Sequence, residues 1–368
     1  MRDILPTLRD WWGRGEAIAV ATVVDVRRSA PRQPGAAMAV NHAGEVVGNV
    51  SGGCVEGAVV EVANEVIADR QPQLVTYGIS DDEAFAVGLT CGGELDVFVD
   101  VHDGDTTVLT QLADAVESET PVALATVLSG PAEIGAKLLV GDGSSAGTLG
   151  DKRLDAAVLD DARGMLAQGS TAQRHYGAHG ERRVDDVTVF IESFAPRPRL
   201  YVFGAIDFAA AVARAGRFLG YHVTVCDARA VFATRKRFPD VDELVVEWPH
   251  RFLADAPVDA RTAICVLTHD PKFDVPVLEI ALRSDAVYVG AMGSRRTHAD
   301  RLERLREAGL GDEELARLRS PIGLDIGART PEETAVSIMA EIIRDRWGGA
   351  GQPLRETDGP IHRERPRV

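Results

Sequence analysis

The sequence predicts an α/β protein with two differently built parts. The N-terminal part is an α/β domain made from a degenerate internal repeat, because its strand-like segments recur about 100 residues later. The C-terminal part is a doubly wound, Rossmann-like domain, because near-continuous apolar strands alternate there with helices, as in a parallel sheet covered on both faces. Two prolines in SFAPRPR (193–199) interrupt both strand and helix and indicate a linker between domains at 1–192 and 200–347.

Composition and charge limit the possible functions. The chain has 368 residues, with 40 basic against 56 acidic side chains and a formal net charge of −16, which argues against a nucleic-acid or anionic-membrane partner. No apolar run approaches the roughly 20 residues of a membrane span. The four cysteines include no CxxC pair, and the N-terminus does not resemble a secretory signal, so we expect a cytoplasmic protein.

The repeat relates segments 16–102 and 120–192. AIAVATVV (17–24) recurs as PVALATVL (121–128), and GAAMAV (35–40) recurs as GAKLLV (135–140). Gly48 and Tyr77 meet Gly147 and Tyr176, each 99 positions later. Each half is therefore expected to form the same set of strands around one helix.

The first half carries a cysteine motif that the second half lacks. Ser51, Gly52, Gly53 and Cys54 precede the helical run VEGAVVEVANEVIADR, so the glycines allow a sharp turn, and a thiol in the first helical turn would be activated by the helix dipole. A second cysteine, Cys91, is also followed by two glycines. At the repeat spacing Arg153 occupies the position of Cys54. The scaffold therefore does not require the thiol, which favours a functional role for it.

A basic stretch follows the first predicted strand. Arg27, Arg28, Ser29 and Arg32 lie beside prolines and a glycine. Two interpretations stay open at this point. The stretch is either a solvated hairpin loop or an anion-binding lip beside the glycine-rich turn, since arginine forks match phosphate geometry.

The first turn of the second domain departs from a dinucleotide fingerprint. Gly204 ends the first strand, but Ile206 stands where the second glycine would admit a pyrophosphate, and Asp207 places a carboxylate at the helix N-terminus. Asp227 and Arg229 follow the second strand, where a ribose-binding acid or a phosphate-binding arginine would lie. NAD(P) binding is therefore an alternative that Ile206 and Asp207 weaken.

Later strand ends offer further candidates. Gly293, Ser294, Arg295 and Arg296 precede a helix that Ser294 would cap, which gives either an anion site or a plain surface loop. His269 follows another strand beside Asp270, as an acid–base pair or as a simple strand end. Other features of this domain are structural: core cysteines Cys226 and Cys265, a final helix opened by a capping box at Thr330, and a flexible tail at 348–368.

Several motifs in this order resemble the xanthine dehydrogenase accessory protein family, XdhC/CoxI. They are SGGCVEG, CGGELDVFV, VTVCDAR, THD, GAMGSRR and PIGLDIGARTPEE, and the resemblance covers residues 17–347. It implies a cysteine-bearing N-terminal domain and a C-terminal Rossmann domain. Cys54 and Cys91 match the cysteine motifs of the family, and Gly204, Asp227 and the loop 290–296 match its Rossmann motifs. The departure is Ile206-Asp207, where relatives commonly carry Gly-His.

The resemblance also implies a function. Members bind molybdenum cofactor, assist its sulfuration and deliver it to molybdenum hydroxylases. We therefore expect a cofactor-binding maturation factor for a xanthine dehydrogenase-like apoenzyme, with a sulfurtransferase and a second copy of the chain as further partners. No metal site is assigned, although Cys54 would be the residue to contact molybdenum, with Cys91 as its helper. Two alternatives are an NAD(P)-dependent oxidoreductase and an adaptor that carries no cofactor.

Overall fold

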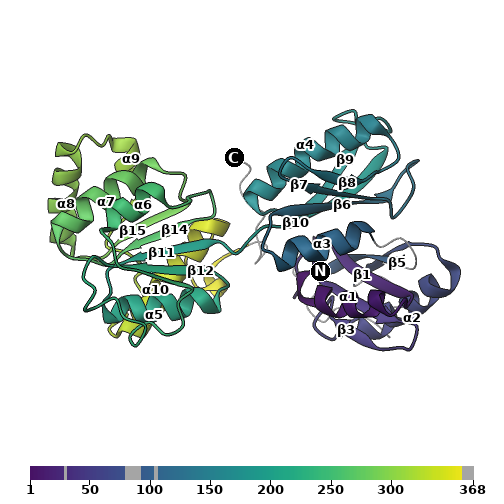
Figure 1. Cartoon of the computed structure of the whole chain (residues 1–368), viewed down its shortest axis with the longest axis horizontal. Helices are drawn as coiled ribbons and strands as arrows, with labels where there is room; N and C mark the ends of the chain where they lie inside the picture. The colour runs from purple at the N-terminus through teal and green to yellow at the C-terminus, as the bar shows by residue number, and fades with distance from the viewer. Residues whose placement is uncertain (29–30, 79–92, 103–106, 359–368) are drawn as a thin grey trace. The chain divides into compact units, whose positions relative to one another are not determined.

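A computed structural model describes residues 1–28, 31–78, 93–102 and 107–358. The chain divides into two compact units, the first ending at Pro196 and the second beginning at Arg197 (Figure 1). The first unit contains two five-stranded antiparallel sheets, and the second contains a six-stranded parallel sheet. The predicted fold class is confirmed.

The two sheets of the first unit have the same strand order. One runs β3-β2-β1-β5-β4 and the other β8-β7-β6-β10-β9, so the repeat seen in the sequence corresponds to a repeated topology. The strands of the first sheet are β1 (Ile18–Arg27), β2 (Ala37–Asn41), β3 (Val46–Gly48), β4 (Gln73–Tyr77) and β5 (Glu94–His102). Those of the second sheet are β6 (Val122–Ser129), β7 (Lys137–Gly141), β8 (Ser145–Gly147), β9 (Ala172–Tyr176) and β10 (Val187–Phe194).

The two sheets face each other, and helices cover their outer faces. Side chains alternate along a strand, so Ala19, Ala21 and Val23 of β1 pack on α2 (Glu56–Asp69), whereas Val24 packs against Phe98, Leu128 and Phe190 between the sheets. Helix α4 (Lys152–Gln168) covers the second sheet in the same way. The short η1 (Arg2–Ile4), α1 (Leu5–Gly13) and α3 (Thr107–Glu117) join one apolar cluster with strands of both sheets.

The second unit has helices on both faces of its sheet, which runs β13-β12-β11-β14-β15-β16. One face carries α5 and α10, and the other carries α6 to α9 (Figure 1). The strands are β11 (Arg199–Phe203), β12 (His222–Cys226), β13 (Glu243–Val245), β14 (Ala263–Val266), β15 (Tyr288–Ala291) and β16 (Leu318–Arg319). The helices are α5 (Asp207–Phe218), α6 (Pro249–Asp255), α7 (Pro271–Arg283), α8 (Arg295–Glu307), α9 (Asp312–Ala316), α10 (Pro331–Trp347) and the short η3 (Leu354–Glu356).

Local sequence patterns account for several of these features. Thr330 caps α10 by accepting a hydrogen bond from the Glu333 N–H, and the Glu333 carboxylate accepts from the Thr330 N–H, so the predicted capping box is confirmed. Cys226 and Cys265 are buried in the core as predicted, and burial raises the pKa of both thiols. The last strand of the first unit ends at Phe194, and the first strand of the second unit begins at Arg199. The connection between them is therefore residues 195–198, whereas the linker was expected at 193–199.

Candidate functional site

One carboxylate organises the loop that carries Cys54. Glu56, the first residue of α2, accepts hydrogen bonds from five backbone N–H groups and from the Ser51 hydroxyl. Gly52 and Gly53 have φ angles of +81° and +116°, which glycine adopts without strain, and their N–H groups both donate to Glu56. The N–H donors belong to Val50, Ser51, Gly52, Gly53 and Val55, at 2.8–3.2 Å from the carboxylate oxygens.

These donors decide how Glu56 is charged. Burial by itself raises the pKa of the Glu56 carboxyl, but the hydrogen bonds from Ser51 and the loop amides outweigh it and lower the pKa overall. The ionised carboxylate therefore fills a concave set of amides that would otherwise attract an external anion. Glu56 was not among the residues predicted from the sequence, although a glutamate three residues after Gly53 at the start of a helix resembles the acidic member of a capping box.

Cys54 lies in this loop and not in the helix. The expectation that its thiol occupies the first helical turn is wrong, because α2 begins at Glu56 with Val55 in the N-cap position. The Cys54 N–H donates to Ser51 Oγ at 2.9 Å, and the residue is partly exposed. Its backbone is thus held by Ser51, and Ser51 is in turn held by Glu56 at 2.6 Å.

The second half keeps the acid but not the loop. Asp155 takes the position of Glu56 and accepts from the Leu149 N–H and the Thr148 hydroxyl, both at 2.7 Å. Helix α4 already begins at Lys152, so Arg153, the counterpart of Cys54, is helical. The glycine-rich loop and its cysteine therefore occur in only one half of a common scaffold.

The three arginines after β1 have different surroundings. Arg27 donates to Glu94 at 2.8 Å and to Asp96 at 2.6 Å, and these hydrogen bonds raise the pKa of its guanidinium. Because three carboxylates, those of Asp25, Glu94 and Asp96, already pair with Arg27, it is not available to a phosphate in the way expected of an anion-binding lip. Arg28 is exposed at the end of the strand, and Arg32 lines a separate hollow described below. Ser29 lies outside the described residues.

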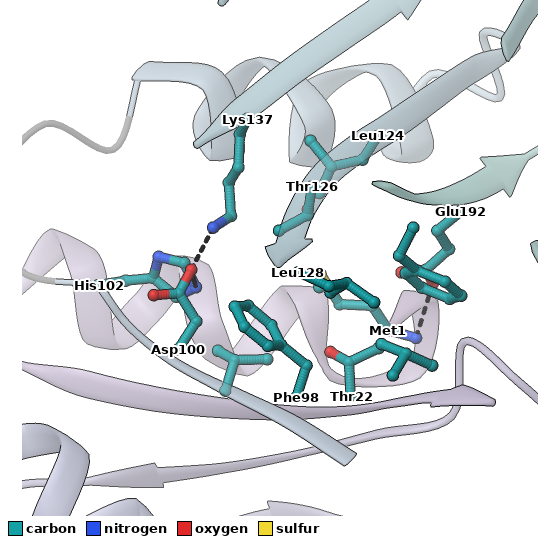
Figure 2. Close-up of a pocket in the computed structure, with 13 residues that line it drawn as sticks. Met1, Thr22, Phe98, Asp100, His102, Leu124, Thr126, Leu128, Lys137 and Glu192 are labelled. Carbon is teal, nitrogen blue, oxygen red and sulfur yellow. Dashed lines mark hydrogen bonds and ion pairs between the residues drawn. The ribbon is translucent and has the colours of Figure 1, made fainter. Parts of the chain in front are cut away.

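A small cavity lined by both apolar and charged side chains lies between the two sheets (Figure 2). Its volume is about 20 Å³, enough for about one water molecule, so it cannot hold a cofactor. Lys137 pairs with Asp100 on one side, and the Met1 amino group pairs with Glu192 on the other. These two acids occupy matching positions, each two residues after a phenylalanine that also lines the cavity.

The two ammonium groups also occupy matching positions. Lys137 donates to the Gly135 carbonyl at 2.9 Å, and the Met1 amino group donates to the equivalent carbonyl of Gly35. Nearby, burial and then the positive charge of Lys137 lower the pKa of His102 to about 4, despite the opposing charge of Asp100. These charged groups therefore join the two halves of the unit and are already partnered.

In the second unit Asp227 is satisfied within the protein. It is 2% exposed, and its carboxylate accepts from the Ala205 N–H at 2.7 Å and from the Arg229 guanidinium at 2.7 and 2.9 Å. Burial raises the pKa of Asp227, but the hydrogen bonds from Arg229 and Ala205 lower it overall.

Gly204 is tightly enclosed, because a side chain there would meet Thr268. Asp207 begins α5 and pairs with Arg237 at 2.9 Å, so a carboxylate stands at that helix N-terminus.

The 290–296 loop is fixed by a residue that the sequence analysis missed. Ser294 Oγ accepts from the Thr297 N–H at 3.1 Å and caps α8 as predicted, directly after Gly293 and before Arg295. Arg301, 2% exposed, donates to Asp274 at 2.8 Å and to the Met292 carbonyl at 2.9 Å. The sequence did not indicate that Arg301 is buried, because it is one of several arginines in α8.

The remaining candidates give no second site. His269 is exposed, and the neighbouring Asp270 caps α7 and pairs with Lys272 at 3.0 Å. Cys91 lies outside the described residues. Within the part of the chain that the structure describes, no group of three or more His, Cys, Asp or Glu residues could hold a metal ion. No helix in the same part is long and apolar enough to cross a bilayer.

Comparisons with known proteins cover both units. The XdhC and CoxI family matches residues 11–78 and 115–177, and the XdhC Rossmann domain matches residues 200–342. The chain is 28% identical to a protein of Bacillus subtilis (strain 168) that is named as a probable xanthine dehydrogenase subunit, over 90% of this chain and 94% of that protein. It is 27% identical to the molybdenum cofactor insertion chaperone PaoD of Escherichia coli (strain K12), over 90% of this chain and 84% of that protein.

A solved structure has the same fold. It is a crystal structure of a xanthine dehydrogenase from Bacillus halodurans, with a TM-score of 0.67 and 25% identity over 93% of this chain and 95% of that one. The XdhC matches therefore fall in both units, and the similarity to solved and curated relatives runs through nearly the whole length. The chain belongs to the XdhC and CoxI family, with an XdhC Rossmann domain as its second unit.

Proposed function

We propose that this protein is a maturation factor that binds molybdenum cofactor and delivers it to a xanthine dehydrogenase-type apoenzyme, with Cys54 as the thiol that contacts the cofactor. The observation that carries the proposal is the loop of Cys54, which hydrogen bonds to Ser51 and Glu56 hold in place and which only one of the two repeat halves possesses. The hydrogen bonds of Ser51 and Glu56 hold the backbone of this loop, in which Cys54 is partly exposed. A purely structural cysteine would not need such an arrangement.

The chemistry of the available side chains fits this cofactor. Thiolate sulfur is a soft ligand suited to sulfur-rich metal centres, and the anionic phosphate of a molybdopterin needs a cation that is not already paired. Arg32 offers that cation, because it lines an open hollow and forms no ion pair with a carboxylate of the described residues. The cofactor supplies the redox-active metal used by the client enzyme, and this chain would only hold and orient it.

The relatives support the same proposal. PaoD is named as a molybdenum cofactor insertion chaperone, and the Bacillus subtilis relative is named as a probable subunit of xanthine dehydrogenase. Both alignments include the segment that contains Cys54, since each covers 90% of this chain. An accessory role in the maturation of a xanthine dehydrogenase-type enzyme would account for both names.

The test compares cofactor retention between variants of the full chain. The protein is purified from cells that make molybdenum cofactor, and pterin fluorescence after oxidation and molybdenum content per chain are measured. Cys54→Ala is expected to lower both at least tenfold, whereas Arg153→Ala, the matched position in the other half, should retain wild-type values. Equal cofactor content in the wild type and in a Cys54→Ala, Cys91→Ala double variant would refute the thiol role.

An NAD(P)-dependent oxidoreductase is the second candidate, favoured by one observation. The strand order of the second unit reverses between β11 and β14, which is where doubly wound sheets bind dinucleotides. The internal pairing of Asp227 and the carboxylate of Asp207 count against it. Micromolar NAD(P)H binding in a nicotinamide fluorescence titration, lost in Arg229→Ala, would favour the oxidoreductase over the maturation factor.

A further inference from the structure

A second hollow on the first unit is large enough for a small molecule. It has a volume of about 430 Å³, within the usual range for ligand pockets, and lies where the hairpin turn before β2 meets the end of β10. Both repeat halves contribute to its walls. Its polar lining consists of Arg2, Asp3, Arg32, Gln33, Thr171, Glu192 and Ser193.

Arg32 is the unusual residue in this hollow. The residue is partly buried, and its Nε is inaccessible to water yet has no hydrogen-bond partner. Among the described residues no carboxylate forms an ion pair with its guanidinium. Removing a charged donor from water without a partner is costly, and native proteins pair such groups with a side chain, water or a ligand. Because Arg32 lines the hollow, an anion bound there would give its guanidinium the charged partner that it lacks.

The other half of the repeat shows that the fold does not require this lining. The turn segments 31–35 (PRQPG) and 131–135 (PAEIG) align without a gap, and both end in a glycine with positive φ, +93° at Gly35 and +86° at Gly135. Both turns also make the same backbone hydrogen bonds, to Val23 in one half and Val127 in the other. Only the side chains differ. Arg32 and Gln33 correspond to Ala132 and Glu133 in the second turn. Beside the turns, Thr171 and Ser193 correspond to Pro72 and Val101.

The charges around the hollow leave Arg32 as its principal cation. Arg2 adds a second guanidinium, although one of its nitrogens donates to the Ala195 carbonyl at 2.7 Å. Glu192 is neutralised by the Met1 amino group at 3.0 Å, and Asp3 is the other acid of the lining. The hydroxyl of Ser193 donates to the Ser170 carbonyl, and Gln33 is a neutral donor of the lining directly after Arg32 in the sequence.

We infer that this hollow binds a small molecule through a phosphate group, with Arg32 as the residue that pairs with it. Planar guanidinium groups bind phosphate oxygens in a bidentate manner, which a lysine cannot reproduce. The inference deepens the proposed function, on which the assignment of the phosphate to the cofactor rests. A phosphate site in this hollow would stand even if the protein carried no molybdenum cofactor, since the hollow does not include Cys54. The phosphate can belong to that cofactor or to a free phosphate ester, and the two sources are separable.

The test titrates the full chain with inorganic phosphate at constant ionic strength, with chloride as the reference, and follows binding by calorimetry. The wild type is expected to bind saturably. Arg32→Ala should weaken binding at least tenfold without disturbing the turn, because alanine occupies the same place in the other half. Arg32→Lys should give intermediate binding. Arg174→Ala, which removes an exposed charge that does not line the hollow, should bind as the wild type does.

Each outcome decides the inference. Absence of saturable phosphate binding by the wild type, or equal binding by Arg32→Ala, overturns it. If Arg32→Ala loses phosphate binding and also loses pterin, the site holds the phosphate of the cofactor. If it loses phosphate binding but retains pterin, or if the wild type carries no pterin at all, the site belongs to a free phosphate ester. In that last case the proposed function fails while the phosphate site stands.

Discussion

Glu56→Gln is the substitution that most directly tests how the loop of Cys54 is held. The amide has nearly the shape of the carboxylate, but it keeps only one accepting oxygen and turns an NH₂ group toward donors. Each carboxylate oxygen accepts three hydrogen bonds, so about half of the six donors lose their acceptor. At roughly 1 kcal/mol for each lost bond in a partly exposed site, the loop should be destabilised by about 2–3 kcal/mol.

The assay is hydrogen exchange of the loop peptide, measured by mass spectrometry at pH 7. A loss of about 2–3 kcal/mol corresponds to exchange that is roughly 30- to 160-fold faster. The matched control is Asp155→Asn in the other half. Its carboxylate accepts from one N–H and one hydroxyl, so the peptide around it should exchange less than about tenfold faster.

The pH dependence of the same measurement has a defined sign. The pKa of folded Glu56 lies below its usual value, so its stabilisation is present above the usual glutamate pKa and is lost as the pH falls through the folded value. The difference between the wild type and Glu56→Gln should therefore disappear in acid. Unchanged protection of the loop at pH 7 in Glu56→Gln, or an equal effect of Asp155→Asn, would refute this account.

Three further predictions concern the core of each unit. Lys137→Ala leaves Asp100 buried without its partner, so urea unfolding of the first unit should show a loss of about 3–5 kcal/mol, and a loss below about 1 kcal/mol would contradict the role of the pair. The pKa of folded His102, about 4, lies below its usual value, so the first unit should lose up to about 3 kcal/mol as the pH falls from about 6.5 to 4. His102→Gln should flatten that profile, and an unchanged slope would count against it. Cys226 and Cys265, whose pKa values burial raises, should resist iodoacetamide at pH 8 until the protein unfolds, and labelling of either in the folded protein, mapped by mass spectrometry, would contradict their burial.

The sequence predicted features that depend on local patterns. Strand periodicity and the repeat spacing indicated the two matching sheets, because the hydrophobic pattern of each strand determines which face is buried. The caps by Thr330 and Ser294 were predictable for the same reason, since a capping side chain and the N–H group that donates to it are three residues apart. Cys226 and Cys265 lie in apolar strands that could only be buried.

Features that depend on distant partners were not predicted. The sequence leaves Arg27 either in a solvated loop or in an anion-binding lip. Strand pairing instead places it beside Asp96, about 70 residues away in sequence, and that register is not visible in either segment alone. The role of Glu56 depends on positive φ angles at Gly52 and Gly53, which glycine permits but does not dictate. The burial of Arg301 depends on Asp274 from a different helix.

The most direct test of the central claim is to identify the small molecule that the protein carries. The full chain is purified from cells that make molybdenum cofactor, denatured, and its released ligands are identified by mass spectrometry and by fluorescence after oxidation. The maturation-factor account predicts a pterin together with molybdenum in the wild type, and at least a tenfold loss of both in Cys54→Ala. Release of a nicotinamide dinucleotide without pterin would contradict it.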